Sequence, residues 1–173
     1  MSRGTPTLRE VADPGRDRAF LRLPWRINAP FPRWVPPLLA AVRHTLDRRK
    51  NPFWRRAEAR FWTAWLDGAP IGRIGAILNP AHDEKWNERA GFFGFFECID
   101  DHAAAAVLFD AASGWLRERG ATVLRGPVSP STNDECGVLI EGFDRDPFIM
   151  MPYTPPYYPS LLEARGLRGR MDL

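Results

Sequence analysis

The chain has 173 residues, which suits one domain with a core of ordinary size, and its formal net charge of +3 permits anionic partners without requiring nucleic acid. The sequence has no secretory signal, no apolar run long enough to cross a membrane and only two cysteines, so we expect a cytoplasmic protein without disulfides. Seven tryptophans and a 12% aromatic content predict a large apolar pocket or a surface that contacts lipid.

The N-terminal part predicts three short elements. Residues 8–13 are expected to form a strand that stops at Asp13-Pro14-Gly15, and residues 16–27 a short helix. A proline-rich loop follows, and a second helix is predicted over residues 36–49, ending before Asn51-Pro52. Its apolar side chains share one face at helical spacing: Leu38, Leu39, Val42 and Leu46.

The middle of the chain predicts a β-hairpin and a buried strand. Residues 59–78 contain two aromatic and β-branched runs around Asp67-Gly68, a dipeptide typical of tight hairpin turns. Residues 79–90 are expected to form a mobile polar loop. The run Gly91–Ile99 predicts a strand covered on both sides, with Phe92 and Phe96 on one face and Phe93 and Phe95 on the other.

The C-terminal part predicts a helix, a strand and a second helix. Asp100 or Asp101 can cap a helix that stops at Gly120, and residues 121–128 are expected to form a strand. A long irregular segment, 129–159, precedes a short helix over 160–167. The order predicts one α/β (α+β) domain over residues 1–173, with a mixed, mostly antiparallel sheet and helices on both faces.

The hairpin "LDGAPIGRIGAIL" and the closing "LLEARGL" resemble the GNAT acyltransferase superfamily. The strings "DRRKNPFW", "GFFGFFEC", "GPVSPSTNDECG" and "MMPYTPPYYPSLLEARG" resemble a group of bacterial proteins related to bacterial ceramide synthase. The resemblance implies a GNAT-like domain that is the N-terminal part of a longer two-domain architecture. It further implies transfer of an acyl group from acyl-CoA to an amine, with a long-chain base as a possible acceptor.

The superfamily likeness also implies where the acyl-CoA donor lies and where this sequence departs from the pattern. The donor is expected in a gap between strands 91–99 and 121–128, with its pyrophosphate at the start of the following helix, where unpaired N–H groups favour an anion. The family's arginine and glycine positions there fall on Asp100, Asp101, Ala103 and Ala105. Two carboxylates repel a pyrophosphate, so the donor's phosphates bind elsewhere, the donor differs, or donor binding has been lost.

Three residues are the catalytic candidates. Glu97 ends an apolar strand, where desolvation would make its carboxylate a base for an attacking ammonium, and its alternative role is an ordinary strand-end carboxylate. Glu135 lies in the polar loop 129–137 and is the second candidate for the base. The family's thiolate-protonating tyrosine falls on Leu162, so we expect Tyr153, or Tyr157 or Tyr158, to replace it.

The expected binding residues surround the same place. The peptide N–H groups of the edge from Phe96 through Cys98 to Ile99 are expected to hold the thioester carbonyl. Arg125 and Asn133 complete the predicted donor site, and the predicted substrate pocket comprises Phe95, Ser131, Tyr157 and Tyr158. No metal is expected, because Cys98, Asp100, Asp101 and His102 lack a second ligand pair.

The segment 43–62 interleaves basic and aromatic side chains and suggests peripheral contact with the inner membrane face. Its basic members are Arg43, Arg48, Arg49, Lys50, Arg55, Arg56 and Arg60, beside Phe53, Trp54 and Trp62. An equally open alternative is a solvated helix end whose arginines pair with local acids. The rivals to an enzyme are therefore a non-catalytic GNAT-like module that pairs with another domain or a homodimer partner, and a lipid-binding domain.

Overall fold

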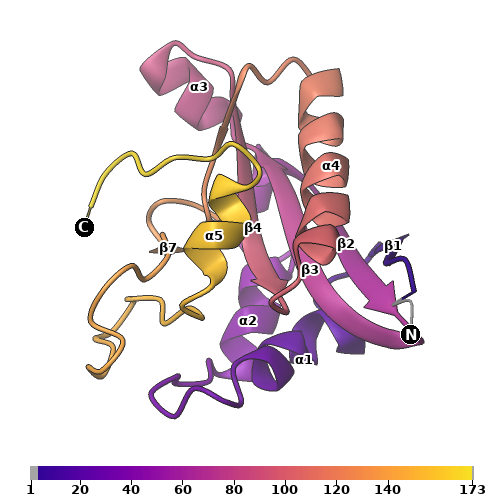
Figure 1. Ribbon diagram of the computed structural model, residues 1–173. Coiled ribbons are helices and arrows are strands. Elements are labelled where there is room, and N and C mark those ends of the chain that lie inside the picture. The colour runs from indigo at the N-terminus through magenta and orange to yellow at the C-terminus, as the bar shows by residue number, and fades with distance from the viewer. Residues whose placement is uncertain (1–3, 173) are drawn as a thin grey trace.

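The central sheet has five strands in the order β1-β2-β3-β4-β5, as a computed structural model of the chain, describing residues 4–172, shows in Figure 1. The first four strands are antiparallel to their neighbours, and β4 and β5 are parallel. The strands are β1 (Thr7–Glu10), β2 (Glu58–Leu66), β3 (Ala69–Leu78), β4 (Ala90–Cys98) and β5 (Val123–Arg125). The predicted mixed, mostly antiparallel sheet is confirmed.

Helices cover both faces of the sheet and create two apolar cores. On one face α1 (Arg18–Ile27) and α2 (Leu39–Leu46) pack with Phe61, Ile77 and Phe92. On the other face α4 (His102–Glu118) and α5 (Tyr158–Glu163) pack with strand residues that include Ile74 and Phe93. Figure 1 shows α4 lying along the sheet with α5 beside it, in front of β4. The predicted helices on both faces are thus confirmed.

The hairpin between β2 and β3 follows from its turn sequence. Asp67 and Gly68 both have positive φ, 49° and 78°, as a two-residue turn that matches the twist of antiparallel strands requires. Leu66 pairs with Ala69 directly across that turn. The hairpin carries Arg73 on β3 to a position opposite Glu97 on β4.

A β-bulge in β4 corrects the predicted orientation of its phenylalanines. Arg73 pairs with Glu97 and Gly75 with Gly94, so two residues of β4 oppose one of β3, and Phe95 has φ of 51°. The extra residue breaks the alternation of side chains. Phe93 and Phe96 consequently pack in the core under α4, whereas Phe92 and Phe95 pack under α1.

Two predicted segments have different structures. Residues 79–90 contain a helix, α3 (Pro80–Trp86), because Pro80 fits its first turn and Asn87 ends it with φ of 50°. The predicted strand 121–128 is interrupted, since Gly126 has φ of 150° and Pro127 has no N–H to donate. After the interruption β6 (Val128–Ser129) pairs with β7 (Glu135–Cys136) in a separate two-stranded sheet.

The remaining elements position the cleft described below. The predicted helix 36–49 is shorter than expected, and Leu38 precedes it with a largely exposed side chain. A short 3-10 helix, η1 (Pro52–Arg55), follows, with the Trp54 indole donating to the Thr45 carbonyl at 2.7 Å. Gly94 permits β6 to cross β4 closely, since a Cβ there would lie 1.5 Å from the Val128 carbonyl oxygen.

Candidate active site

A cleft of about 500 Å³ opens beside the bulge in β4. Its walls come from the end of α1, from α2 and the proline-rich segment before it, from the β6–β7 hairpin, and from the loop 147–154. Phe95 and Phe96 contribute apolar surface, and the charged side chains of the lining are Arg73, Glu97, Asp134 and Glu135. The cleft therefore combines an apolar lining with carboxylates, as a site for an amphiphilic substrate requires.

Glu97 is held in a polar network inside this wall. Its Oε2 accepts a hydrogen bond from the Tyr158 hydroxyl at 2.7 Å and another from Asn28 Nδ2 at 3.3 Å. Its Oε1 lies 3.7 Å from Arg73 Nη2, and the two charged side chains are only 16% and 8% exposed. Glu97 is therefore not an ordinary solvent-facing carboxylate at a strand end.

Arg73 is anchored by the first helix. Its Nη1 donates to the Phe20 carbonyl at 2.7 Å, and its guanidinium lies 4.8 Å from the centre of the Phe20 ring. Arg73 Nε and Asn28 Oδ1 are buried and have no hydrogen-bond partner among the described residues. Buried polar atoms without partners are unfavourable, so a network that retains two of them is typical of a functional site.

Desolvation and the charge of Arg73 act on the pKa values of both glutamates, although Glu97 is largely buried and Glu135 is exposed. Desolvation raises the pKa of Glu97, opposed by the charge of Arg73 and by the hydrogen bonds from Tyr158 and Asn28. Desolvation also raises the pKa of Glu135, and Arg73 again opposes the change. Burial lowers the pKa of Arg73, but a guanidinium keeps its proton in proteins. The positive charge of Arg73 therefore lowers the pKa of both glutamates, against the effect of desolvation.

Two tyrosines of the C-terminal segment bind the edge of β4. The Cys98 N–H donates to the Tyr158 hydroxyl at 3.1 Å, and the Tyr157 hydroxyl donates to the Cys98 carbonyl at 2.9 Å. The Tyr158 hydroxyl therefore accepts from the strand and donates to Glu97. The Cys98 N–H, one of the predicted holders of a thioester carbonyl, becomes free only if this hydroxyl moves.

The structure brings several predicted site residues to the cleft. Glu97, Glu135, Phe95, Phe96 and Tyr153 line it. The Tyr153 hydroxyl donates to the Phe143 carbonyl at 2.8 Å, which fixes the ring against the loop. The predicted pair of glutamates therefore lies in one cavity, on strands β4 and β7.

Other predicted residues lie outside the cleft lining. Arg125 forms a bidentate pair with Glu88, at 2.8 Å for Nη2–Oε2, near the beginning of β4. The Ser131 hydroxyl donates to Asp134 at 2.6 Å and accepts from the exposed Asn133 N–H at 3.2 Å. Ile99 donates its N–H to the Ile71 carbonyl, so its peptide group belongs to the sheet.

At the start of α4, the helix's own N-cap residue occupies a backbone N–H group that an anion could otherwise bind. Asp101 accepts from the Ala104 N–H at 2.9 Å, and Ala104 and Ala105 are fully buried. The expected pyrophosphate position therefore carries a carboxylate already engaged as the N-cap. Cys98 is buried against this helix, where desolvation raises the pKa of its thiol.

Sequence reasoning missed Arg73 and Asn28. A signal for Arg73 was present, because it is the one charged residue in the apolar run "PIGRIGAIL". Asn28 is the C-cap of α1, which contains Pro24, and carries no comparable signal. Its role depends on its Nδ2 donating both to the Pro24 carbonyl and to Glu97, 69 residues away.

Two further properties concern the described part of the chain. Over residues 4–172 no helix is long and apolar enough to span a bilayer. Within the same range, His, Cys, Asp and Glu side chains do not gather in groups of three that could hold a metal ion.

Comparison with known proteins first defines the class of fold. No family model matches the chain. An aminoglycoside acetyltransferase from an uncultured soil metagenomic sample, solved with sisomicin, superposes with a TM-score of 0.54 at 9% identity, covering 98% of this chain and 93% of that one. A putative acetyltransferase from Pyrococcus furiosus gives 0.54 at 14% identity, covering 97% and 96%. The chain therefore has the fold of the GNAT acyltransferases.

Sequence relatives then place the chain within that class. It is 37% identical over 164 residues to the bacterial ceramide synthase of Caulobacter vibrioides, and 37% identical over 156 residues to the protein YghO of Escherichia coli. The matches cover 94% and 90% of this chain but only 43% and 40% of those proteins. The chain is thus a GNAT-fold relative of bacterial ceramide synthase, as the sequence resemblance predicted, and spans less than half the length of these curated relatives.

Proposed function

We propose that this domain catalyses N-acyl transfer, in which an amine attacks the carbonyl carbon of an acyl thioester. The new C–N bond forms, the C–S bond breaks and the thiolate leaves, while the amine nitrogen gives up a proton. The observation that carries the proposal is the position of Glu97, a desolvated carboxylate in the cleft wall beside the bulge of a GNAT-fold β4. A carboxylate with a raised pKa is a stronger base toward an ammonium than an exposed one.

The neighbours of Glu97 have distinct roles in this proposal. Glu97 takes the amine proton, and Arg73 holds the carboxylate in place without being able to accept a proton itself. The Tyr158 hydroxyl, 2.7 Å from Glu97, gives its proton to the leaving thiolate and takes back the amine proton from Glu97, so that the raised pKa that burial gives Tyr158 does not leave a tyrosinate behind. Glu135 is the second candidate base, since it lies in the same cleft and also near Arg73.

The proposed substrates are an acyl-CoA donor and a long-chain amine acceptor. Support comes from the apolar mouth of the cleft, where Phe148 is 80% exposed, Ile149 is 94% exposed and Val35 is 67% exposed. Exposed apolar side chains around one opening favour a ligand with a hydrocarbon chain. The relative named bacterial ceramide synthase supports the same substrate class.

A non-catalytic role is the second candidate, and two contacts favour it. Asp101 already caps α4 where a donor pyrophosphate is expected, and the Tyr158 hydroxyl already binds the Cys98 N–H. A domain whose N–H groups at the start of α4 and at Cys98 are both occupied by its own side chains would bind a partner or a lipid without catalysing a reaction. Because the chain spans less than half of its curated relatives, the activity of the isolated domain is itself part of the proposal.

Calorimetric titration with coenzyme A and with a long-chain acyl-CoA separates the two candidates. The acyl-transfer proposal expects binding of the acyl-CoA, with affinity that rises with acyl length because the cleft mouth is apolar. Absence of binding by either compound to folded protein would exclude the acyltransferase role for this chain and support the non-catalytic module.

Turnover of three variants tests the assignment of the base. Glu97→Gln should lower thiol release from acyl-CoA in the presence of a long-chain amine by about 100-fold or more, because general base catalysis typically contributes that much. Glu135→Gln tests the alternative base. Glu141→Gln is the control, since Glu141 is an exposed carboxylate outside the cleft lining. Unchanged turnover in both cleft variants would contradict the role of either glutamate.

A further inference from the structure

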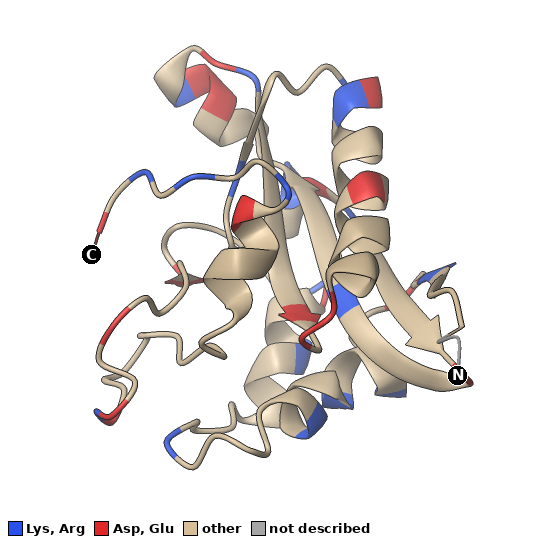
Figure 2. Cartoon of the chain, in the orientation of Figure 1, with Lys and Arg blue, Asp and Glu red and all other residues tan. Residues whose placement is uncertain are grey.

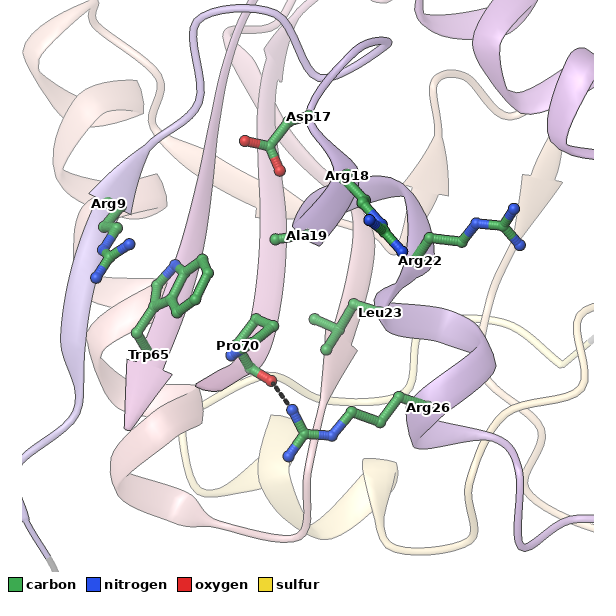
Figure 3. Close-up of a pocket in the computed structure, with 9 residues that line it drawn as sticks. All are labelled: Arg9, Asp17, Arg18, Ala19, Arg22, Leu23, Arg26, Trp65 and Pro70. Atoms are coloured by element: carbon green, nitrogen blue, oxygen red, sulfur yellow. Dashed lines mark hydrogen bonds between the residues drawn. The ribbon is translucent and has the colours of Figure 1, made fainter. Parts of the chain in front are cut away.

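A second cavity, lined by arginines, lies on the other side of α1 from the cleft. It encloses about 620 Å³ and is lined by Arg9, Asp17, Arg18, Ala19, Arg22, Leu23, Arg26, Trp65 and Pro70. Figure 3 shows Arg9 and Trp65 on one side and Arg18 and Arg22 on the other, with the Arg22 guanidinium directed outward. Ala19 and Leu23 lie between the two sides, and Arg26 reaches across to the Pro70 carbonyl. This groove, called here the arginine groove, shares no lining residue with the cleft.

The arginines of the groove have no carboxylate partner among the described residues. Arg18, Arg22 and Arg26 follow one another at four-residue spacing and so lie on one face of α1. The one acid of the lining, Asp17, accepts from the Phe20 N–H at 2.7 Å and is the N-cap of the same helix. Like charges at this spacing repel one another, and an anion in the groove would relieve that repulsion.

The groove holds its cations beside apolar surface. The Arg9 guanidinium lies 4.1 Å from the centre of the Trp65 ring, and Arg26 Nη1 donates to the Pro70 carbonyl at 3.0 Å. Leu23 is buried in the floor, and Trp65 is half-buried at the rim. Cations around an apolar floor fit an anionic group attached to a hydrocarbon chain better than they fit a free inorganic anion.

The basic segment 43–62, in which the sequence predicted membrane contact, differs from the arginine groove because several of its arginines bind a carboxylate or a backbone carbonyl. Arg48 donates to the Ala59 carbonyl, Arg56 pairs with Glu84, and Arg60 pairs with Glu10 at 3.3 Å. Trp54 is buried. In Figure 2 blue segments lie on α1 and α2 at the lower edge of the molecule, and others lie on α3, at the end of α4 and along the C-terminal segment. Among these, the arginines of the groove line a cavity and have no carboxylate partner within residues 4–172.

We propose that the arginine groove binds the phosphate of an anionic phospholipid headgroup at a membrane surface. Arg18 contacts the phosphate, and Arg22, whose guanidinium lies 5.4 Å from the centre of the Trp25 ring, turns from that ring toward it. Arg9 and Arg26 flank the phosphate, and the apolar floor receives the first part of the lipid chain. The inference does not depend on acyl transfer, because it uses none of the residues of the cleft. It would bring the protein to a lipid surface whether or not the cleft is catalytic.

Co-sedimentation of the chain with vesicles tests this proposal. The protein should bind vesicles of equal parts phosphatidylcholine and phosphatidylglycerol and should dissociate from them when salt is added. It should not bind vesicles of pure phosphatidylcholine. Arg18→Gln/Arg22→Gln should weaken binding about 25-fold, since one arginine near an anionic surface contributes about fivefold. Ala19→Glu, which adds a carboxylate to the groove floor near the helix start, should weaken it as well.

The matched control is Arg49→Gln/Arg55→Gln, which removes the same charge from exposed arginines outside the groove. Equal loss in the control and in the groove variant would overturn the proposal, because net charge alone would then explain binding. Binding of glycerol phosphate or pyrophosphate without vesicle binding would overturn the lipid assignment, as would absence of binding to the anionic vesicles. Thermal unfolding of each variant verifies that the fold is retained.

Discussion

Glu97 and Arg73 are two charges largely withdrawn from water, and each depends on the other and on polar neighbours. Their carboxylate and guanidinium atoms lie 3.7 Å apart, a distance at which attraction is present without a direct hydrogen bond. Phe20, Asn28 and Tyr158 supply the hydrogen bonds that the pair itself does not make. Removing either charge leaves the other buried and uncompensated, which typically costs about 3–5 kcal/mol.

The raised pKa of Glu97 predicts how stability depends on pH. Between the carboxyl's ordinary pKa, about 4.3, and its higher pKa in the folded state, the native protein holds a proton that the unfolded chain has lost. The contribution of Glu97 to the free energy of unfolding therefore falls as pH rises through this window. In Glu97→Gln that slope is absent, so the stability of the wild type relative to the variant should decrease with rising pH.

Urea unfolding of the two proteins at a series of pH values measures this difference directly. Glu141→Gln, which removes an exposed carboxylate outside the cleft lining, is the control variant. A relative stability that increases with pH would mean that Arg73 lowers the pKa of Glu97 more than burial raises it.

At the scale of elements, the bulge in β4 and the crossing of β6 place the cleft. The bulge turns Phe95 toward α1 and Phe96 toward α4 while keeping Glu97 opposite Arg73. β6 then passes over Gly94, and the Ser129 hydroxyl accepts from the Phe95 N–H at 3.0 Å. The bulge and the crossing strand together form one wall of the cavity.

The close crossing predicts that Gly94→Ala is strongly destabilising. The added Cβ would meet the Val128 carbonyl oxygen at 1.5 Å, and because this atom belongs to the backbone, β6 itself must move. We expect a loss of about 3 kcal/mol or more in the free energy of unfolding. The matched control is Gly114→Ala in α4, where nothing lies within 4 Å and alanine should stabilise the helix by about 0.5–1 kcal/mol.

Chemical denaturation of both glycine variants gives the comparison. A Gly94→Ala protein as stable as the wild type would show that β6 does not pack on β4 as described. Loss of stability in Gly114→Ala would instead indicate that the helix face around residue 114 is more crowded than its surroundings suggest.

Elements signalled by local chemistry could be predicted from the sequence. Asp67-Gly68 specifies a hairpin turn, and Asp101 caps a helix through its own neighbouring N–H groups. The bulge could not be predicted, because Phe95 is a residue type that rarely adopts positive φ and does so here through tertiary packing. The helix α3 was missed because Asn79-Pro80 suits a loop and a helix start equally well.

The candidate site was only partly predictable for a related reason. Glu97 was found because a carboxylate in an apolar strand is unusual in itself. Its partners Asn28 and Tyr158 lie 69 and 61 residues away, and only the folded chain brings them together. Predicting that Arg73 lies opposite Glu97 requires the register of β3 against β4, and the bulge shifts that register.

At the scale of the whole molecule, α1 separates two cavities of different character. The cleft holds a carboxylate network behind an apolar mouth, and the groove holds arginines that have no carboxylate partner among the described residues around an apolar floor. Exposed apolar side chains gather beside the cleft, including Phe148 and Ile149 in the loop 147–154. Clustered apolar exposure of this kind marks a surface that binds something apolar, since scattered single residues would not form a rim.

The apolar rim predicts where a neutral hydrophobic probe will bind. Phe148→Ser/Ile149→Ser should reduce the fluorescence of bound Nile red severalfold, because the change removes apolar surface from the cleft mouth. The unfolding midpoint should change little, because the two side chains are 80% and 94% exposed and contribute little packing. The control Trp86→Ser/Met171→Ser removes two other exposed apolar side chains, 61% and 75% exposed, outside the cleft lining. Equal losses of fluorescence in the two variants would mean that the probe reports general surface hydrophobicity, whereas a loss confined to the rim would make the cleft mouth the entry for a hydrocarbon chain.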